Sequence, residues 1–376
     1  MIKYLYIFKI ILLKFIYLNF FFLKRNISGY PTFVEEFEKS FAKFIGKKNG
    51  LTFCNGTSSI EAAIYALDLE PSSEILITSS TFHASIGPIV NLKYIPKFVD
   101  IDNETLTIDC EDLESKINEK TKALIIVHPW GNPCNMDKLV EIVKKNNLKL
   151  IEDCSHAHGA SYNKQKVGSF GDISCFSLQG NKAIAAGEGG ICVTDNNLYF
   201  LRMSIYGHFN RHQINMDQLK EFNKFSKTGI SKKLRAHPLG IALAKVDFDN
   251  LLTMNKYRLN VYEKIDNILN NNKQIKLIKL NKNSTRGGFF GGYPLIINKF
   301  ENVEKIKQIF LNYNFKLTAY PWLLHHKMEI YNSQSTPLIV TEDISERLFF
   351  LKIPFFLNFK FQNLKKCLEK VNSEFN

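Results

Sequence analysis

Between residues 50 and 155 the chain alternates short runs rich in β-branched and aromatic residues with longer stretches of helical period. The strand-like runs are GLTFCN (50–55), EILITSS (74–80), IPKFVDID (95–102), ALIIVHP (123–129) and LKLIEDCS (148–155). Two shorter runs follow, DISCFSLQ (172–179) and GGICVTD (189–195). This alternation predicts an α/β fold with a three-layer, mostly parallel sheet covered by helices on both faces. Ligands of such sheets bind beyond the carboxyl ends of the strands.

The length of the chain, 376 residues, predicts one large domain and a smaller one. We expect an apolar helical segment over 1–28, a large domain over 29–245 and a small α+β domain over 246–376, which includes the interdomain helix. A long helical pattern begins at Pro238 and continues to Leu252, and proline suits the first turn of a helix.

The formal net charge of +13 is compatible with binding to nucleic acid, to an anionic membrane or to phosphorylated substrates. The lysines are scattered, and no nucleic-acid motif with interleaved aromatic residues is present, so we expect no nucleic-acid partner. The seven cysteines are odd in number, form no C-x-x-C pair and often lie in strand-like runs. This usage predicts reduced cysteines in a cytoplasmic protein and disfavours a bound metal.

The first 26 residues are very apolar but are interrupted by Lys3, Lys9, Lys14 and Asn19. No uninterrupted apolar run approaches the ~20 residues that cross a bilayer, and no small-residue cleavage site follows. Two interpretations remain open. Residues 1–25 form either a helix on a membrane surface, as a peripheral contact, or a helix packed on the protein body or a partner subunit.

Polar residues follow two of the strand-like runs. Gly56 and Thr57 open a helix directly after the first run, and a helix start of this kind can bind an anion or simply be capped. Glu152 and Asp153 end the run at 148–155, so one of the two points into the predicted cleft. A buried carboxylate needs a cation, which could be a protonated ring nitrogen, a metal or an arginine.

Histidines at positions 156 and 158 follow this carboxylate pair. They lack the H-E-x-x-H spacing of a helical zinc site. For His158 we expect an ordinary structural hydrogen bond.

Lys182 lies in the stretch FSLQGNKAIAAGEGG (176–190), between an apolar run and a series of very small residues. A lysine there, a carboxylate at a strand end and an anion-binding helix start together match the needs of pyridoxal 5'-phosphate (PLP). The lysine would form the Schiff base, the carboxylate would pair with the pyridinium nitrogen and the helix start would hold the phosphate.

From residue 28 to residue 360 the chain resembles the DegT/StrS-type sugar aminotransferases, which are PLP enzymes of fold type I. The matching stretches are VEEFEKSFAKFIGKKNGLTFCNGTSS, TFHAS, PKFVDIDNETLTID, VHPWGNPCNMD, IEDCSHAHGA, GSFGDISCFSL and NKAIAAGEGG. Many ordered matches are more specific than any single motif.

The resemblance implies roles for individual residues around the cofactor. Lys182 stands at the position of the Schiff-base lysine, and Asp153 at that of the pyridinium partner. Phe82 matches the aromatic residue that stacks on the cofactor ring; otherwise it is an ordinary core phenylalanine. His156 matches a position that approaches the phenolic oxygen of the ring.

The phosphate contacts follow by the same resemblance. Gly56, Thr57 and Ser177 match phosphate-binding positions, and the alternative for Ser177 is a solvated or capping hydroxyl. Lys233 stands where the family has an asparagine that reaches the phosphate of the partner subunit, two residues before Arg235. A lysine can bind phosphate as a point charge, so Lys233 is included among the cofactor-binding residues.

Two regions depart from the family. Residues 1–25 do not resemble its usual opening segment. The stretch YPWLLHH matches a substrate-loop motif only loosely, so for His325 and His326 we favour an ordinary surface loop.

The resemblance implies a PLP-dependent aminotransferase that moves an amino group from glutamate or glutamine to a keto-sugar. A nucleotide-linked sugar used for surface polysaccharide or a related glycan is the expected acceptor, and the expected assembly is a cytoplasmic homodimer. Dehydratases of the family carry histidine at the lysine position, which Lys182 contradicts. A keto-inositol acceptor and a non-catalytic regulatory member of the same fold remain alternatives.

Overall fold

The computed structural model describes residues 2–24, 30–208, 220–225, 228–230, 232–270, 272–287, 292–320, 324–331, 336–352 and 360–375. Its helices are α1 (Ile2–Lys24), α2 (Thr32–Ile45), α3 (Gly56–Leu67), α4 (Gly87–Asn91), α5 (Cys110–Lys116), α6 (Met136–Lys145), α7 (Asn197–Gly207), α8 (Pro238–Asp249), α9 (Leu251–Leu269), α10 (Val303–Asn312), α11 (Ile339–Ser345) and α12 (Phe361–Glu374).

The described strands form three sheets, of which one is much larger than the others. The large sheet contains β1 (Asn49–Phe53), β2 (Glu74–Thr78), β3 (Ile95–Val99), β4 (Thr121–Val127), β5 (Lys149–Asp153), β8 (Ile173–Ser177) and β9 (Gly190–Thr194). A four-stranded sheet contains β10 (Ile275–Lys276), β12 (Tyr293–Ile297), β13 (Leu317–Ala319) and β14 (Leu348–Leu351). A small three-stranded sheet contains β6 (Ser161–Tyr162), β7 (Gln165–Lys166) and β11 (Ser284–Thr285).

The large sheet has the strand order β1-β9-β8-β5-β4-β2-β3. The five strands from β8 to β3 run parallel to one another, whereas β9 is antiparallel to both β8 and β1. The prediction of a mostly parallel sheet is therefore confirmed. The antiparallel strand is the one that returns from the loop carrying Lys182, so that loop connects two adjacent strands.

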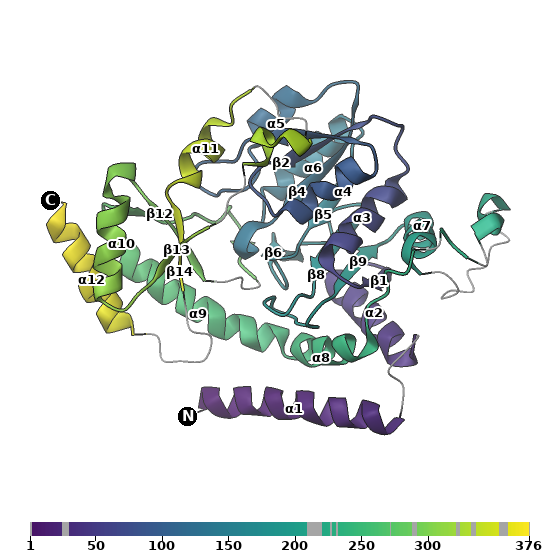
Figure 1. The fold of residues 1–376 in the computed structure, drawn as a ribbon, viewed down its shortest axis with the longest axis horizontal. Coiled ribbons are helices and arrows are strands. Elements are labelled where there is room, and N and C mark those ends of the chain that lie inside the picture. The colour runs from purple at the N-terminus through teal and green to yellow at the C-terminus, as the bar shows by residue number, and fades with distance from the viewer. Residues whose placement is uncertain are drawn as a thin grey trace.

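Helices cover both faces of the large sheet and make three layers (Figure 1). One face packs against α3, α4 and α7, and the other against α2, α8, α5 and α6. The register of β4 shows how the layers arise. Ala123 and Ile125 belong to the first core, whereas Leu124 and Ile126 belong to the second, because successive side chains of a strand point to opposite faces.

Asparagine or aspartate caps several of the helices that follow these strands. The Asn55 side chain accepts the Ser58 N–H at the start of α3, and Asp109 accepts two N–H groups at the start of α5. Pro238 occupies the first turn of α8, as predicted. The single helical pattern predicted to continue to Leu252 is two helices, because the chain departs from helical geometry at Asn250 (φ −107°, ψ 2°).

A second core lies in the C-terminal part of the chain. Helices α9, α10 and α12 pack against the four-stranded sheet through residues between Tyr262 and Val371. In Figure 1 this unit stands beside the large sheet, and α9 reaches it from α8. The boundary between 245 and 246 stays a prediction.

Helix α1 lies along the outside of α8 (Figure 1), so it packs on the body of the protein, as one of the two interpretations expected. Ile10 is buried in this contact, and Lys14 pairs with Asp247 of α8 at 2.7 Å. The outward arc is apolar and exposed, formed by Phe8, Ile11, Leu12, Phe15 and Ile16. Among the described residues, no helix combines the length and the apolar character that a membrane crossing needs.

Candidate active site

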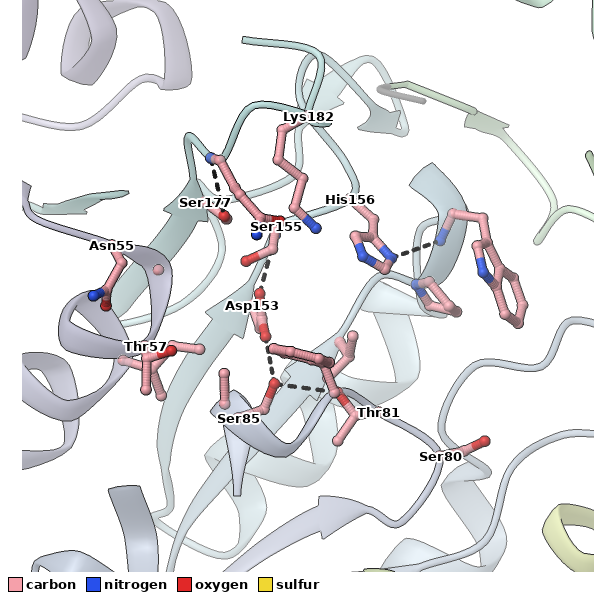
Figure 2. Close-up of a pocket in the computed structure, with 18 of the residues that line it drawn as sticks. Asn55, Thr57, Ser80, Thr81, Ser85, Asp153, Ser155, His156, Ser177 and Lys182 are labelled. Atoms are coloured by element: carbon pink, nitrogen blue, oxygen red, sulfur yellow. Dashed lines mark hydrogen bonds between the residues drawn. The ribbon is translucent and has the colours of Figure 1, made fainter. Parts of the chain in front are cut away.

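A cleft of about 760 Å³, including its open mouth, lies at the carboxyl ends of the parallel strands. Its walls come from the segments that follow β2, β4, β5 and β8 and from the first turn of α3. Figure 2 shows the side chains of these segments converging on one space. The cleft therefore lies where the sheet topology predicts a ligand.

The register of β5 decides which of its two terminal carboxylates enters the cleft. Asp153 shares the face of Ile151, which packs towards α3, and it lines the cleft. Glu152 shares the face of Leu150 and turns away from it. Asp153 is thus the member of the predicted pair that points into the site.

Two donors hold the Asp153 carboxylate, which is 4% exposed. The Ser85 hydroxyl donates to Oδ2 at 2.7 Å, and the Ser155 N–H donates to Oδ1 at 3.0 Å. The Thr81 hydroxyl lies 3.1 Å from that of Ser85, which extends this polar chain (Figure 2). Each carboxylate oxygen can accept about two hydrogen bonds, so acceptor capacity remains for a group in the cleft.

Lys182 lies in the loop between β8 and β9, and its side chain enters the cleft (Figure 2). The loop is closed by Gly180 N–H to the Gly187 carbonyl at 2.7 Å and by Lys182 N–H to the Gln179 carbonyl at 2.9 Å. Gly187 has a φ of +84°, a conformation that favours glycine. Burial lowers the pKa of Lys182 to about 8, although Asp153 opposes this shift. About a tenth of the amine is therefore unprotonated at pH 7.

His156 lies on the opposite wall of the cleft from α3 and beside Lys182 (Figure 2). Its Nδ1 accepts the Trp130 N–H at 3.4 Å, which leaves the proton of the neutral ring on Nε2. Burial, followed by the charges of Lys182 and His158, lowers its pKa well below the ordinary value. Trp130 adopts the left-handed conformation (φ 50°, ψ 27°), which is strained for a bulky residue. The ring of His156 is thus a neutral donor to the cleft.

The start of α3 forms the third side of the cleft. The N–H groups of its first turn precede the first intrahelical hydrogen bond, and Asn55 satisfies that of Ser58 at 2.8 Å. A Cβ atom on Gly56 would lie 2.9 Å from the Cβ of Ser177, so glycine allows β8 to approach this turn. Thr57 is exposed and lines the cleft. Free amides, hydroxyls and the helix dipole make an anion-binding site here.

Two further predicted cofactor contacts lie at the margin of the site or outside it. Phe82 lines the cleft and is 58% exposed, so it is not a core phenylalanine; its stacking role stays a prediction. Lys233 is exposed and pairs through its backbone with His208, and it does not line the cleft of its own chain. The expected contact of Lys233 is with a partner subunit, so that role also stays a prediction.

Three buried histidines lie outside the cleft. The His158 ring is 1% exposed, packs on Phe176 and interacts with the Ser177 backbone, and its expected structural hydrogen bond stays a prediction. Burial lowers the pKa of His158 to about 3. The surface-loop interpretation of His325 and His326 is wrong, because both side chains are buried. His326 Nδ1 lies 2.8 Å from the Ser79 hydroxyl, which ties this loop to the end of β2.

Sequence reasoning missed the residues that orient the predicted ones. Ser85 and Ser155 hold the Asp153 carboxylate, and Trp130 holds the His156 ring. Ser85 ends the quoted stretch TFHAS, and Trp130 lies in VHPWGNP, but neither motif says which atom a side chain will face.

Comparison with known proteins places these residues in a family. The model of the DegT/DnrJ/EryC1/StrS aminotransferase family matches residues 24–372. GDP-perosamine synthase of Escherichia coli O157:H7 is 42% identical over 174 residues, 46% of this chain and 48% of that protein. L-Glutamine:scyllo-inosose aminotransferase of Streptomyces griseus is 33% identical over 168 residues, 45% of this chain and 40% of that protein. These matches span about half of the length of the relatives.

The fold agrees with solved structures as well. An aminotransferase from Psychrobacter cryohalolentis superposes with a TM-score of 0.85 at 21% identity, over 96% of each chain. The family model covers far more than half of the sequence and includes every element of the cleft. The chain therefore belongs to the DegT/DnrJ/EryC1/StrS aminotransferase family.

Proposed function

We propose that this protein is a PLP-dependent aminotransferase that acts on a keto-sugar. One observation carries the proposal: the Lys182 amine, with its pKa lowered to about 8, shares a cleft with the buried Asp153 carboxylate and the open start of α3. An amine, a carboxylate and an anion site around one space are the groups that PLP needs.

The residues present fit the cofactor. The amides of the α3 start, with Thr57 and Ser177, suit the phosphate, and Gly56 keeps that corner free of a side chain. Asp153 retains acceptor capacity for a protonated ring nitrogen, and His156 offers an Nε2–H donor to a phenolic oxygen. Phe82 would supply the stacking face.

When bound, the cofactor supplies an electron-accepting ring that makes a proton on the carbon of a bound amine acidic. Asp153 would sustain that property, because its negative charge favours a positive charge on the ring nitrogen. Lys182 would hold the cofactor through its side-chain amine, and the same amine would serve as the base that takes the proton from the substrate carbon. Its lowered pKa suits this role, because an amine with a pKa near the working pH can accept and donate.

The proposed amino donor is glutamate or glutamine, and the proposed acceptor is a nucleotide-linked keto-sugar for surface polysaccharide or a related glycan. The name of the 42%-identical relative refers to a GDP-linked sugar, which supports this class. The net charge of +13 suits an acidic nucleotide. The name of the Streptomyces relative favours a keto-inositol as the second candidate. A screen of both acceptor classes with glutamate and glutamine separates them.

We also propose a cytoplasmic homodimer in which Lys233 of each chain contacts the phosphate at the site of the other. The exposure of Lys233 outside its own cleft supports this arrangement. Lys233→Ala should weaken cofactor binding and leave Lys182 reactive. Unchanged cofactor affinity in a proven dimer would refute the contact.

We propose separately that the exposed face of α1 makes a peripheral membrane contact. The exposed apolar side chains of Phe8 and Phe15 and the exposed Lys9 support this contact. Liposome sedimentation of the protein with and without residues 1–25 tests it. Equal sedimentation would remove the membrane contact.

Incubation of the purified protein with PLP tests the central proposal. The protein should turn yellow, and borohydride should fix the cofactor to Lys182, as peptide mapping would show. Lys182→Ala should stay colourless with its fold retained, whereas Lys144→Ala, which changes an exposed lysine of α6, should behave as wild type. A wild type that gains no absorption band would overturn the aminotransferase proposal.

A further inference from the structure

The loop that carries Lys182 rests on helix α8. The Ala185 N–H donates to Oδ2 of Asp247 at 3.0 Å. Gly240, in the first turn of α8, lets the helix approach the loop, because a Cβ atom there would lie 2.7 Å from the Ala186 carbonyl oxygen. Ala183 and Ala186 share a core with the apolar face of α8. The backbone just after Lys182 is therefore held by one helix.

The same carboxylate oxygen also binds helix α1. Lys14 Nζ lies 2.7 Å from Oδ2 of Asp247, and the two side chains are 27% and 16% exposed. The charge of Asp247 also acts on Arg258, where it partly offsets the burial that lowers the pKa of Arg258 to about 10. Asp247 thus connects the N-terminal helix, through one atom, to the loop of the candidate catalytic lysine.

We infer that Asp247 is a positioning residue for Lys182 and that α1 supports the site through Lys14. The inference rests on the proposed function in that it takes Lys182 as the cofactor lysine. A hydrogen bond from a backbone amide to a charged carboxylate is among the stronger ones, and this one is shielded on its outer side by α1. Asp247 itself lies outside the cleft and does not line it.

Amide hydrogen exchange at Ala185 in the cofactor-free protein tests the contact directly. We expect Asp247→Ala to raise the exchange rate by about tenfold, the effect of losing one charged hydrogen bond. Asp247→Asn keeps an acceptor oxygen and should restore most of the protection. Lys14→Met should produce a smaller increase, and Lys9→Met, which changes an exposed lysine of the same helix, should produce none. An Asp247→Ala rate equal to that of the wild type would overturn the inference.

Cofactor titration provides the second measurement. In Asp247→Ala the dissociation constant of PLP should rise several-fold and the absorption band should shift, while Lys9→Met matches the wild type. A wild type that binds no PLP would refute the proposed function and leave the exchange result standing. A wild type that binds PLP, with Asp247→Ala and Lys14→Met unchanged in affinity and spectrum, would refute the positioning role. If Asp247→Ala fails to fold, Lys14→Met is compared with Lys9→Met and the wild type in the same two measurements.

Discussion

Asp153 and Glu152 are neighbours in the chain but occupy opposite faces of β5. Glu152 accepts the N–H groups of Gly168, Phe170 and Gly171 at 2.6–2.8 Å. Asp153 accepts one hydroxyl and one N–H. Both carboxylates are buried, so burial alone does not separate a structural acid from the one proposed to act in the site.

The surroundings of Glu152 satisfy it completely. His128 Nε2 lies 3.2 Å from Oε2, while His128 Nδ1 accepts the Cys134 N–H at 3.0 Å. Ser174 donates to Oε1 at 3.2 Å. His128, Glu152 and Cys154 lie close enough to suggest a metal site, yet the hydrogen bonds already use the histidine nitrogens and both carboxylate oxygens. The comparison separates two kinds of buried carboxylate. Asp153 lines a cleft and can accept further hydrogen bonds, so it is available to a ligand. Glu152 has all its acceptor positions occupied and holds the neighbouring loop in place.

The largest expected effect is the loss of catalytic rate when Asp153 is replaced. Asp153→Asn should lower kcat by about 100-fold to 1,000-fold, because a neutral amide no longer stabilises the ring charge. Thermal stability should change little, since the amide oxygen can still accept the Ser155 N–H while the Ser85 hydroxyl, which can also accept, meets the amide N–H₂. Steady-state kinetics with a melting curve checks both. If Asp153→Asn lost stability but kept its activity, Asp153 would have a structural role and the contrast with Glu152 would be wrong.

At Glu152 the expected effect is on stability. Glu152→Gln should lower the free energy of unfolding by about 3 kcal/mol, because its amide N–H₂ meets donors where a charged acceptor stood. Burial raises the pKa of Glu152, but the hydrogen bonds from His128, Gly168 and Gly171 outweigh burial and lower it below 4.5. The unfolded chain therefore takes up the proton first, so the deficit of the variant should shrink as pH falls below 4.5. Urea unfolding at several pH values measures this, and a constant deficit would contradict it.

A smaller effect is expected at Ser85. Ser85→Ala should lower kcat by about tenfold, because the Asp153 carboxylate loses one of its two donors. Ser85→Thr keeps the hydroxyl and should recover most of the rate. The pH dependence of the absorption band should shift in Ser85→Ala only. Equal loss in both variants would indicate packing instead of hydrogen bonding.

The smallest effect is on the titration of Lys182. In the cofactor-free protein, ¹³C-methylated Lys182 should titrate near pH 8. Asp153 favours the charged amine, so Asp153→Asn should lower this midpoint further, while Glu152→Gln on the other face should leave it in place. NMR titration of the three proteins measures the shift. A rise of the midpoint in Asp153→Asn would contradict the arrangement.

Much of this fold was predictable because local patterns and the sheet agree. The alternation of strands and helices predicted the parallel sheet, and the strand ends predicted the position of the cleft. His325 and His326 were predicted wrongly, because they pack against Ser79 at the end of β2, about 247 residues away in the sequence. Ser85 was missed as the partner of Asp153, since 68 residues separate them.

The sequence by itself determined the order of the elements, the family and the residues that carry the candidate chemistry, since these depend on residue type and spacing. The tertiary structure decided which of Glu152 and Asp153 enters the cleft, because the register of β5 assigns each to a face. It also decided that the half-buried Lys182 shares the cleft with Asp153 and has a lowered pKa. Burial and long-range contacts arise only when distant segments pack together, and a pattern of neighbouring residues does not contain them.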